Sequence, residues 1–159
     1  MIQRSTSPRV NPSEETIPLG TLEIRFLVTG DDSNGSVAVM EMTVPAGDNL
    51  TAPPHSHDAY EETIYGTAGT LTWNVDGDAI EVGPGQALCI PRGAVHRFAN
   101  HGSEDATALV VISPAAIGPE YFREVAAVTN AATSGPPDRA RMVEIMRRHG
   151  LTPTPPPSA

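Results

Sequence analysis

Short alternating segments separated by glycine and proline turns restrict this chain to a fold built from strands. Residues 21–28 and 36–44 alternate apolar and polar side chains for much of their length, which is the period of a half-buried strand. Asp76-Gly77 separates two further segments, 71–75 and 79–82, and predicts a tight hairpin because glycine accepts the positive φ of such turns. Other short strands are expected at residues 87–91, 95–99 and 106–113. This pattern predicts an antiparallel sandwich or barrel.

A helical period replaces the strand pattern after Pro119. Four apolar residues then have the spacing of one helix face: Tyr121, Phe122, Val125 and Val128. A second helix is expected after Pro136-Pro137-Asp138, with Gly150 as its stop. Its inward residues would be Met142, Val143 and Met146. The expected fold class is therefore dominated by β-structure, with a short C-terminal helical segment.

Four parts are expected along the chain. Residues 1–20 are polar and contain scattered prolines, which predicts a flexible arm or an edge strand that docks on a neighbour. Residues 21–117 would form the β-barrel and residues 118–150 the helices. Residues 151–159 are rich in proline and are expected to form a disordered tail.

The composition excludes several classes of function. The formal net charge is −9, which opposes binding to nucleic acid because phosphate neutralisation needs clustered positive charge. All ten basic residues are arginine, so no lysine is present for Schiff-base catalysis. A single cysteine, no apolar run of signal-peptide length and no membrane-length apolar stretch predict a cytoplasmic protein of one domain that binds no membrane.

Three of the five histidines fall in two clusters with metal-ligand chemistry. His55 and His57 have the i, i+2 spacing that places both rings on one face of a strand, and His96 follows a proline and glycine turn. A carboxylate follows the first cluster, at Glu61 or Glu62. Strand parity favours Glu61 if the strand is unbroken, whereas a polar turn at residues 58–60 favours Glu62, which we select.

The spacing of these clusters resembles the two motifs of the cupin superfamily. The first reads His55-x-His57-x4-Glu62-x6-Gly69, and the second reads Gly85-x5-Pro91-x-Gly93-x2-His96-x3-Asn100. The first departs from the family pattern only upstream, where Gly47 lies farther from His55 than usual. The resemblance covers roughly residues 20–115. It implies a small single-domain cupin, an antiparallel jelly-roll barrel in which His55, His57, Glu62 and His96 converge on one metal.

Similarity to quercetin-dioxygenase-like cupins implies a metal-dependent oxygenase that acts on a small enolisable or phenolic compound. One divalent transition metal (Fe, Mn, Ni, Co, Cu or Zn) would be the cofactor, and Glu62 would also accept a proton from the substrate. Two alternatives use the same site: a non-redox isomerase, cyclase or decarboxylase, and a cupin that binds a small molecule without catalysis. Because cupin barrels commonly pair through edge strands, a homodimer is expected.

Structural roles are expected for several other residues. Cys89 is expected to be a small buried residue and Tyr65 to lie in the core. Phe98 should face the same interior as His96, and an inward Gly66 would widen the cavity near the metal. No functional role is expected for His101 or His149, which lie in a polar turn and at the end of the last helix.

Overall fold

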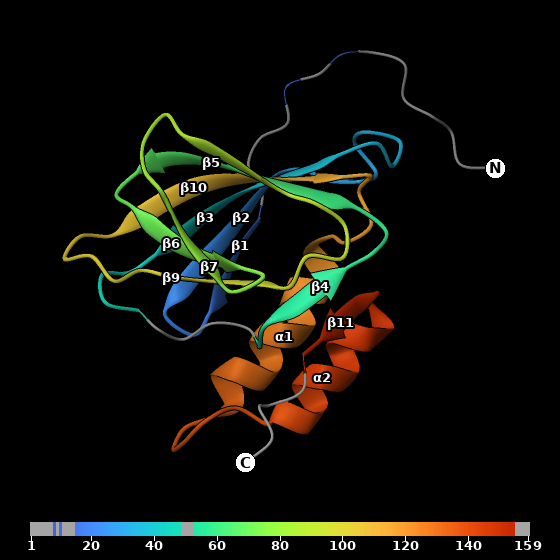
Figure 1. Ribbon diagram of the computed structural model, residues 1–159. Helices are drawn as coiled ribbons and strands as arrows, with labels where there is room; N and C mark the ends of the chain where they lie inside the picture. The colour runs from blue at the N-terminus through green and yellow to red at the C-terminus, as the bar shows by residue number, and fades with distance from the viewer. Residues whose placement is uncertain (1–7, 9, 11–14, 49–52, 155–159) are drawn as a thin grey trace.

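Two facing antiparallel sheets form the body of the molecule in the computed structural model, which describes residues 8, 10, 15–48 and 53–154 (Figure 1). The first sheet contains, in spatial order, β1 (Glu15–Leu19), β2 (Leu22–Val28), β3 (Ala38–Val44), β10 (Ala106–Ser113), β5 (Glu61–Ala68) and β8 (Ala87–Ile90). The second contains β11 (Leu151–Pro153), β4 (His55–His57), β9 (His96–Ala99), β6 (Leu71–Val75) and β7 (Asp78–Val82). The predicted jelly-roll fold class is confirmed.

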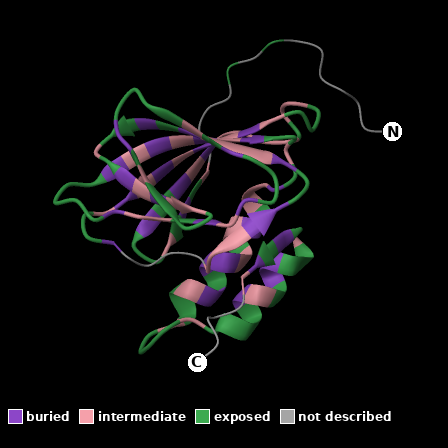
Figure 2. Cartoon of the chain, viewed as in Figure 1, coloured by how far each residue is buried: buried purple, intermediate pink, exposed green. Residues whose placement is uncertain are grey.

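The hydrophobic core fills the space between the two sheets. In β3 and β10, buried and half-buried residues alternate, as expected for strands with one face toward the core (Figure 2). Met40, Trp73 and Ile112 are among the largest fully buried side chains. This alternation was readable in the sequence, and it places the inward side chains of several strands around one interior.

The β6–β7 hairpin has the turn that its sequence predicts. Asp76 and Gly77 have φ values of 50° and 97°, and Val75 pairs with Asp78 across the turn. Two successive positive φ values are characteristic of the hairpin turn whose twist matches the flanking strands. The carboxylate of Asp76 also accepts a hydrogen bond from the backbone N–H of Val95, at 2.9 Å, which fixes the turn against the loop that leads to His96.

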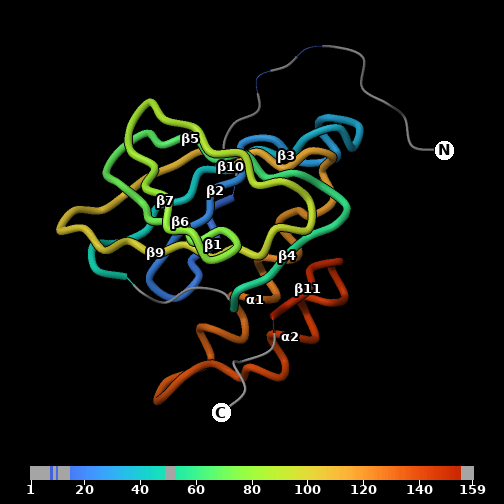
Figure 3. Tube along the Cα trace, viewed as in Figure 1, coloured from blue at the N-terminus to red at the C-terminus, as the bar shows by residue number. Residues whose placement is uncertain are grey.

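Two helices lie at one end of the barrel (Figure 3). Helix α1 (Pro119–Ala131) begins with a proline, and α2 (Arg139–Arg148) is capped by Asp138, which accepts a hydrogen bond from Arg141 N at 3.1 Å. The buried residues are Tyr121, Val125, Ala126 and Val128 on α1 and Met142, Ile145 and Met146 on α2. Ile145 thus takes the inward position expected of Val143, which is half-buried.

The two helices are joined to each other and to the barrel by charged groups. Glu124 of α1 pairs with Arg148, and it also accepts a hydrogen bond from His149 at 3.0 Å. Arg123 of α1 pairs with Glu15 of β1. Among the described residues, neither helix combines the length and the apolar character required to cross a lipid bilayer.

The expected arm and tail each contain a strand. Within residues 1–20, Glu15–Leu19 pairs with β2, because Ile17 and its neighbours alternate and bury one face. Within residues 151–159, Leu151–Pro153 pairs with β4, and Leu151 and Pro153 are buried. The rest of the predicted arm, apart from Pro8 and Val10, and the tail from residue 155 lie outside the described residues.

Three expectations on β5 and β8 are wrong. Cys89 is exposed and Tyr65 is 45% exposed, because both lie on the outward face; Cys89 pairs with Thr63, the outward neighbour of Tyr65 on β5. Gly66 does not widen the cavity. A Cβ atom at this position would lie 2.2 Å from the backbone oxygen of Gly83, so glycine is needed for the close approach of a loop.

Candidate metal centre

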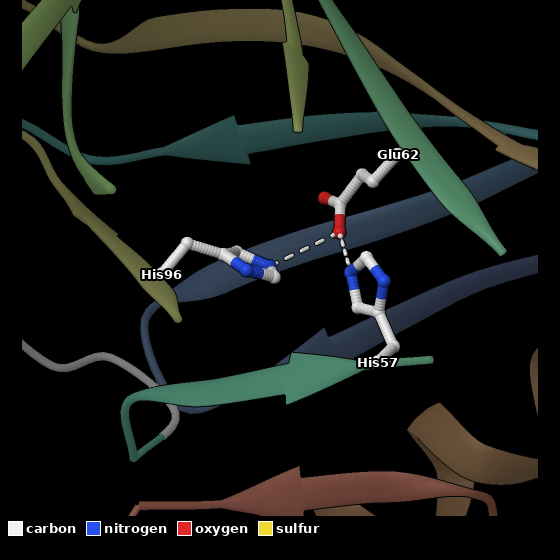
Figure 4. Close-up of side chains that lie close together, drawn as sticks. All are labelled: His57, Glu62 and His96. Atoms are coloured by element: carbon white, nitrogen blue, oxygen red, sulfur yellow. Dashed lines mark hydrogen bonds and ion pairs between the residues drawn. The ribbon is translucent and has the colours of Figure 1, made fainter. Parts of the chain in front are cut away.

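Three strands bring two imidazoles and one carboxylate to a single point inside the barrel (Figure 4). His57 lies on β4, Glu62 on β5 and His96 on β9. Glu62 Oε2 is 3.1 Å from His57 Nε2 and 3.3 Å from His96 Nε2. The ligand atoms of these three residues all lie within 4.8 Å of one another, in a group that could hold a metal ion.

Backbone carbonyls orient each ring of the site. His57 Nδ1 lies 3.0 Å from Tyr60 O, and His96 Nδ1 lies 3.0 Å from Ala94 O. Because a carbonyl oxygen only accepts, the proton of each ring lies on Nδ1 and the Nε2 lone pair is directed at the site. A carbonyl or carboxylate on the far nitrogen is the usual support of a metal-binding histidine.

The donor set fits a cation between the three residues. When Nδ1 carries the proton of a neutral ring, Nε2 presents a lone pair to the carboxylate oxygen, which also presents a lone pair. The two lone pairs repel each other, so a proton or a metal ion is required between the two atoms. Two ligand atoms about 2.1 Å from a common ion are about 3.0 Å apart at right angles and about 3.4 Å apart at the tetrahedral angle. The observed separations of 3.1 and 3.3 Å lie in this range.

The charged groups of the site shift one another's pKa. Burial alone would raise the pKa of Glu62, but hydrogen bonds and charges from His57 and His96 lower it to about 2. For His96, burial lowers the pKa, but the hydrogen bond to Glu62 and its negative charge outweigh burial and raise it. The site therefore keeps an ionised carboxylate, the form that binds a metal ion.

His55, the fourth predicted ligand, lies beside the cluster. Its ring centroid is 4.7 Å from that of His96, and its Nδ1 lies 2.9 Å from Pro53 O, so its Nε2 also carries the lone pair. Burial, followed by the charge of His96, lowers the pKa of His55 to about 4 and keeps the ring neutral. His55 is not part of the group of ligand atoms within 4.8 Å of one another. It stays a prediction as a ligand.

Glu62, and not Glu61, occupies the cluster. Strand β4 ends at His57 and β5 begins at Glu61, so the turn between them breaks the parity that would have favoured Glu61. Glu61 instead faces outward, where Arg92 Nε donates a hydrogen bond to its Oε1 at 2.8 Å. The carboxylate selected from the spacing of the motif is thus the one that lies beside His57 and His96.

A cavity of about 550 Å³ reaches the cluster and has a largely apolar wall. Its polar lining includes His55, Glu62 and His96, and Phe98 lines it as predicted. The apolar wall comes from both sheets and from the two helices, including Leu22, Ile24, Met40, Val110, Val125 and Met142. The volume is in the range of small-molecule sites, roughly 300–1,000 Å³.

Two tyrosines line the cavity although no functional role was predicted for them from the sequence. Tyr60 stacks on His57, with ring centroids 4.0 Å apart and an interplanar angle of 18°, and it is buried. Tyr121, on α1, is 4% exposed and lines the same cavity. Burial raises the pKa of Tyr121 and the negative charge of Glu62 raises it further, so its hydroxyl stays protonated. Helical spacing indicated that Tyr121 faces inward but not that this face meets the cavity.

The C-terminal strand is the edge partner of the strand that carries the histidines. In β11, Leu151 pairs with His57, Thr152 with Ser56 and Pro153 with His55. Thr154 N donates a hydrogen bond to Pro54 O at 2.7 Å, which extends the ladder by one residue. Strand β4 thus lies between β9 and β11, with a histidine of the cluster on each of β4 and β9.

A family model described as "Cupin domain" matches residues 40–112, the segment that contains His55, His57, Glu62 and His96. Residues 40–112 are therefore a cupin domain, as the motifs predicted. Solved structures share the fold. A protein described as a predicted oxalate decarboxylase from Thermotoga maritima aligns with a TM-score of 0.58 and 22% identity, over 67% of this chain and 99% of that one. An RmlC-like cupin from Shewanella frigidimarina aligns with a TM-score of 0.57 and 20% identity, over 69% and 93%.

Curated relatives are similar over parts of their length. Quercetin 2,3-dioxygenase of Bacillus subtilis is 30% identical over 74 residues, which are 46% of this chain but only 21% of that protein. Protein SchB of Streptomyces halstedii is 29% identical over 62% of this chain and 70% of its own length. Polyketide synthase CurC of Streptomyces cyaneus is 37% identical over 41% of this chain and 42% of its own length.

Proposed function

We propose that this cupin is a metal-dependent oxygenase that acts on a small enolisable or phenolic compound. The observation that carries the proposal is the convergence of His57 Nε2 and His96 Nε2 on Glu62 Oε2 beside an apolar cavity. Similarity to a quercetin 2,3-dioxygenase over 46% of this chain supports the reaction class.

His57, Glu62 and His96, with His55 as the predicted fourth ligand, would hold one divalent transition metal. When bound, such an ion supplies a Lewis acid for a substrate oxygen and, if it is redox-active, a route for electrons to dioxygen. Four protein ligands leave one or two coordination positions open for other groups. Nitrogen and carboxylate donors suit Fe, Mn, Co, Ni, Cu and Zn, so the donor set alone selects none of these ions.

Glu62 has a second role in this proposal. Oε2 contacts both rings, whereas Oε1 points away from them (Figure 4). A carboxylate oxygen in this position would accept the proton that a phenol or enol loses as it becomes reactive. The apolar wall would bind the body of the substrate and exclude water from the reacting oxygen.

The test is oxygen uptake by protein loaded separately with each of the six metals, with flavonols, catechols and β-diketones as substrates. The proposal expects oxygen consumption with at least one combination, and a strong loss of this activity in His57→Ala. His101→Ala is the matched control, because His101 is exposed and outside the cluster. Absence of oxygen uptake with every combination would overturn the oxygenase proposal.

A second candidate is non-redox chemistry at the same site, such as enolisation or cyclisation of a polyketone. The similarity to a protein named polyketide synthase CurC, 37% identical over 41% of this chain, supports it. Product formation from a β-polyketone under nitrogen would favour this candidate. Binding without turnover in air and under nitrogen would instead favour a cupin that only binds its ligand.

A further inference from the structure

Helix α1 places one tyrosine hydroxyl at the metal cavity from outside the part of the chain that matches the cupin family. That match ends at residue 112, and Tyr121 lies on the first turn of α1. Tyr121 is 4% exposed and lines the cavity together with Glu62 and His96. Within the described part of the chain, its hydroxyl forms no hydrogen bond.

The hydroxyl of a tyrosine in a pocket usually finds a hydrogen-bond partner. Among the described residues, the buried side-chain polar atom without a partner is Trp73 Nε1, so the Tyr121 hydroxyl, which forms no hydrogen bond, is open to the cavity. The wall of that cavity is largely apolar, and a ligand oxygen there would meet the hydroxyl.

Packing, rather than a hydrogen bond, holds the ring in place. The Tyr121 ring meets Phe122 edge to face, with centroids 4.9 Å apart, and meets His149 in the same manner at 5.4 Å. His149 is fixed in turn by its hydrogen bond to Glu124 of the same helix, α1. The orientation of the hydroxyl is thus set before a ligand binds, which lowers the entropy cost of the contact.

Tyr60 differs from Tyr121 in this respect. Its ring stacks on His57, and its carbonyl oxygen accepts from His57 Nδ1, so its place in the structure is accounted for by support of a predicted metal ligand. No such structural task explains the hydroxyl of Tyr121.

We propose that Tyr121 is a ligand-binding residue, whose hydroxyl donates a hydrogen bond to an oxygen atom of an aromatic or enolic ligand in the cavity. This inference deepens the proposed function and rests on it for the class of ligand. In a cavity with few polar groups, a donor held in place helps to set which way an oxygen-bearing ring system lies. Through Tyr121 the C-terminal helices thereby contribute to specificity.

The experiment compares Tyr121→Phe with the wild-type protein, both loaded with zinc, which does not change oxidation state. 1-Naphthol and naphthalene are the probes, because they share a ring system and only the first carries oxygen. Equilibrium dialysis measures their binding. Loss of one hydrogen bond is expected to weaken 1-naphthol binding about fivefold to tenfold, and to leave naphthalene within about twofold. Tyr65→Phe, at an exposed tyrosine, is the matched control and should change neither affinity.

Equal 1-naphthol affinity in Tyr121→Phe and wild type would overturn the proposal. Thermal unfolding and zinc content show whether the variant is folded and loaded. A second measurement needs no variant: the wild type must prefer 1-naphthol to naphthalene, and equal affinity also overturns the proposal. Zinc content distinguishes failure of this inference from failure of the proposed function. A wild type that takes up no zinc contradicts the proposed metal centre. The comparison of the two probes tests Tyr121 whether or not zinc is bound.

Discussion

The barrel segment that matches the cupin family and the C-terminal segment from Pro119 to Thr154 contribute different things to one cavity. Residues 40–112 supply the whole cluster of His57, Glu62 and His96. The later segment supplies the part of the wall made by α1 and α2, and the edge partner of β4. The difference teaches that the cluster is encoded within the cupin segment alone, whereas the wall of the cavity is shared between the barrel and the C-terminal helices.

The change with the largest expected effect tests whether metal binding depends on the cluster that the barrel segment supplies. Glu62→Gln removes the negative charge that both histidines face, and we expect metal affinity to fall by more than about 100-fold, beyond the usual cost of losing an outer-shell partner. Glu61→Gln is the adjacent control, because its carboxylate pairs with Arg92 at the surface. Metal titration against a chromogenic chelator measures both. Similar affinity in the two variants would place the charge that binds metal elsewhere.

A second change tests how closely the barrel itself is packed, away from the C-terminal helices. Gly66→Ala places a methyl group 2.2 Å from Gly83 O, so the loop must shift, and we expect a loss of about 2 kcal/mol or more in the free energy of unfolding. Gly118→Ala is the control, since its added methyl meets no atom within 4 Å and should cost less than about 1 kcal/mol. Urea unfolding measures the difference. Equal stability of the two variants would show that the loop after β7 can shift at little cost in the free energy of unfolding.

The third prediction challenges the separation of the two regions. Because Thr154 N donates to Pro54 O, the alternation of an antiparallel ladder makes Thr152 and Ser56 the next hydrogen-bonded pair. Thr152→Pro removes the N–H that bonds to β4, and we expect metal affinity to fall about tenfold, as for other residues that orient metal ligands. Thr152→Val keeps that N–H and should stay within about twofold. If both variants bind metal like wild type, β11 has no part in the metal centre.

Much of the fold could be predicted because it depends on local patterns. Alternation located β2 and β3, and proline positions located the starts of α1 and α2. The spacing of the motifs also distinguished Glu62 from Glu61. These features depend on residues near one another in sequence, where side-chain period and turn chemistry act directly.

The missed features depend on contacts between distant segments. Leu151–Pro153 is too short to show a period and is read as part of a proline-rich tail, yet it finds hydrogen-bond partners on β4. The outward positions of Tyr65 and Cys89 follow from the parity of β5 and β8, which the apolar character of the side chains does not reveal. Tyr121 was correctly expected on an inward helix face, but only the packing of α1 on the barrel shows that this face meets the cavity.

The pairing of β4 with β11 has a consequence for the order of events during synthesis. A ribosome releases residues 55–57 long before residues 151–153, so the strand that carries His57 lacks one neighbour while the rest of the barrel emerges. The proposed metal centre acquires its final support only when the distant partner arrives. A nascent chain would thus bind a metal ion more weakly than the folded protein. Tight binding would follow only after β11 has paired with β4.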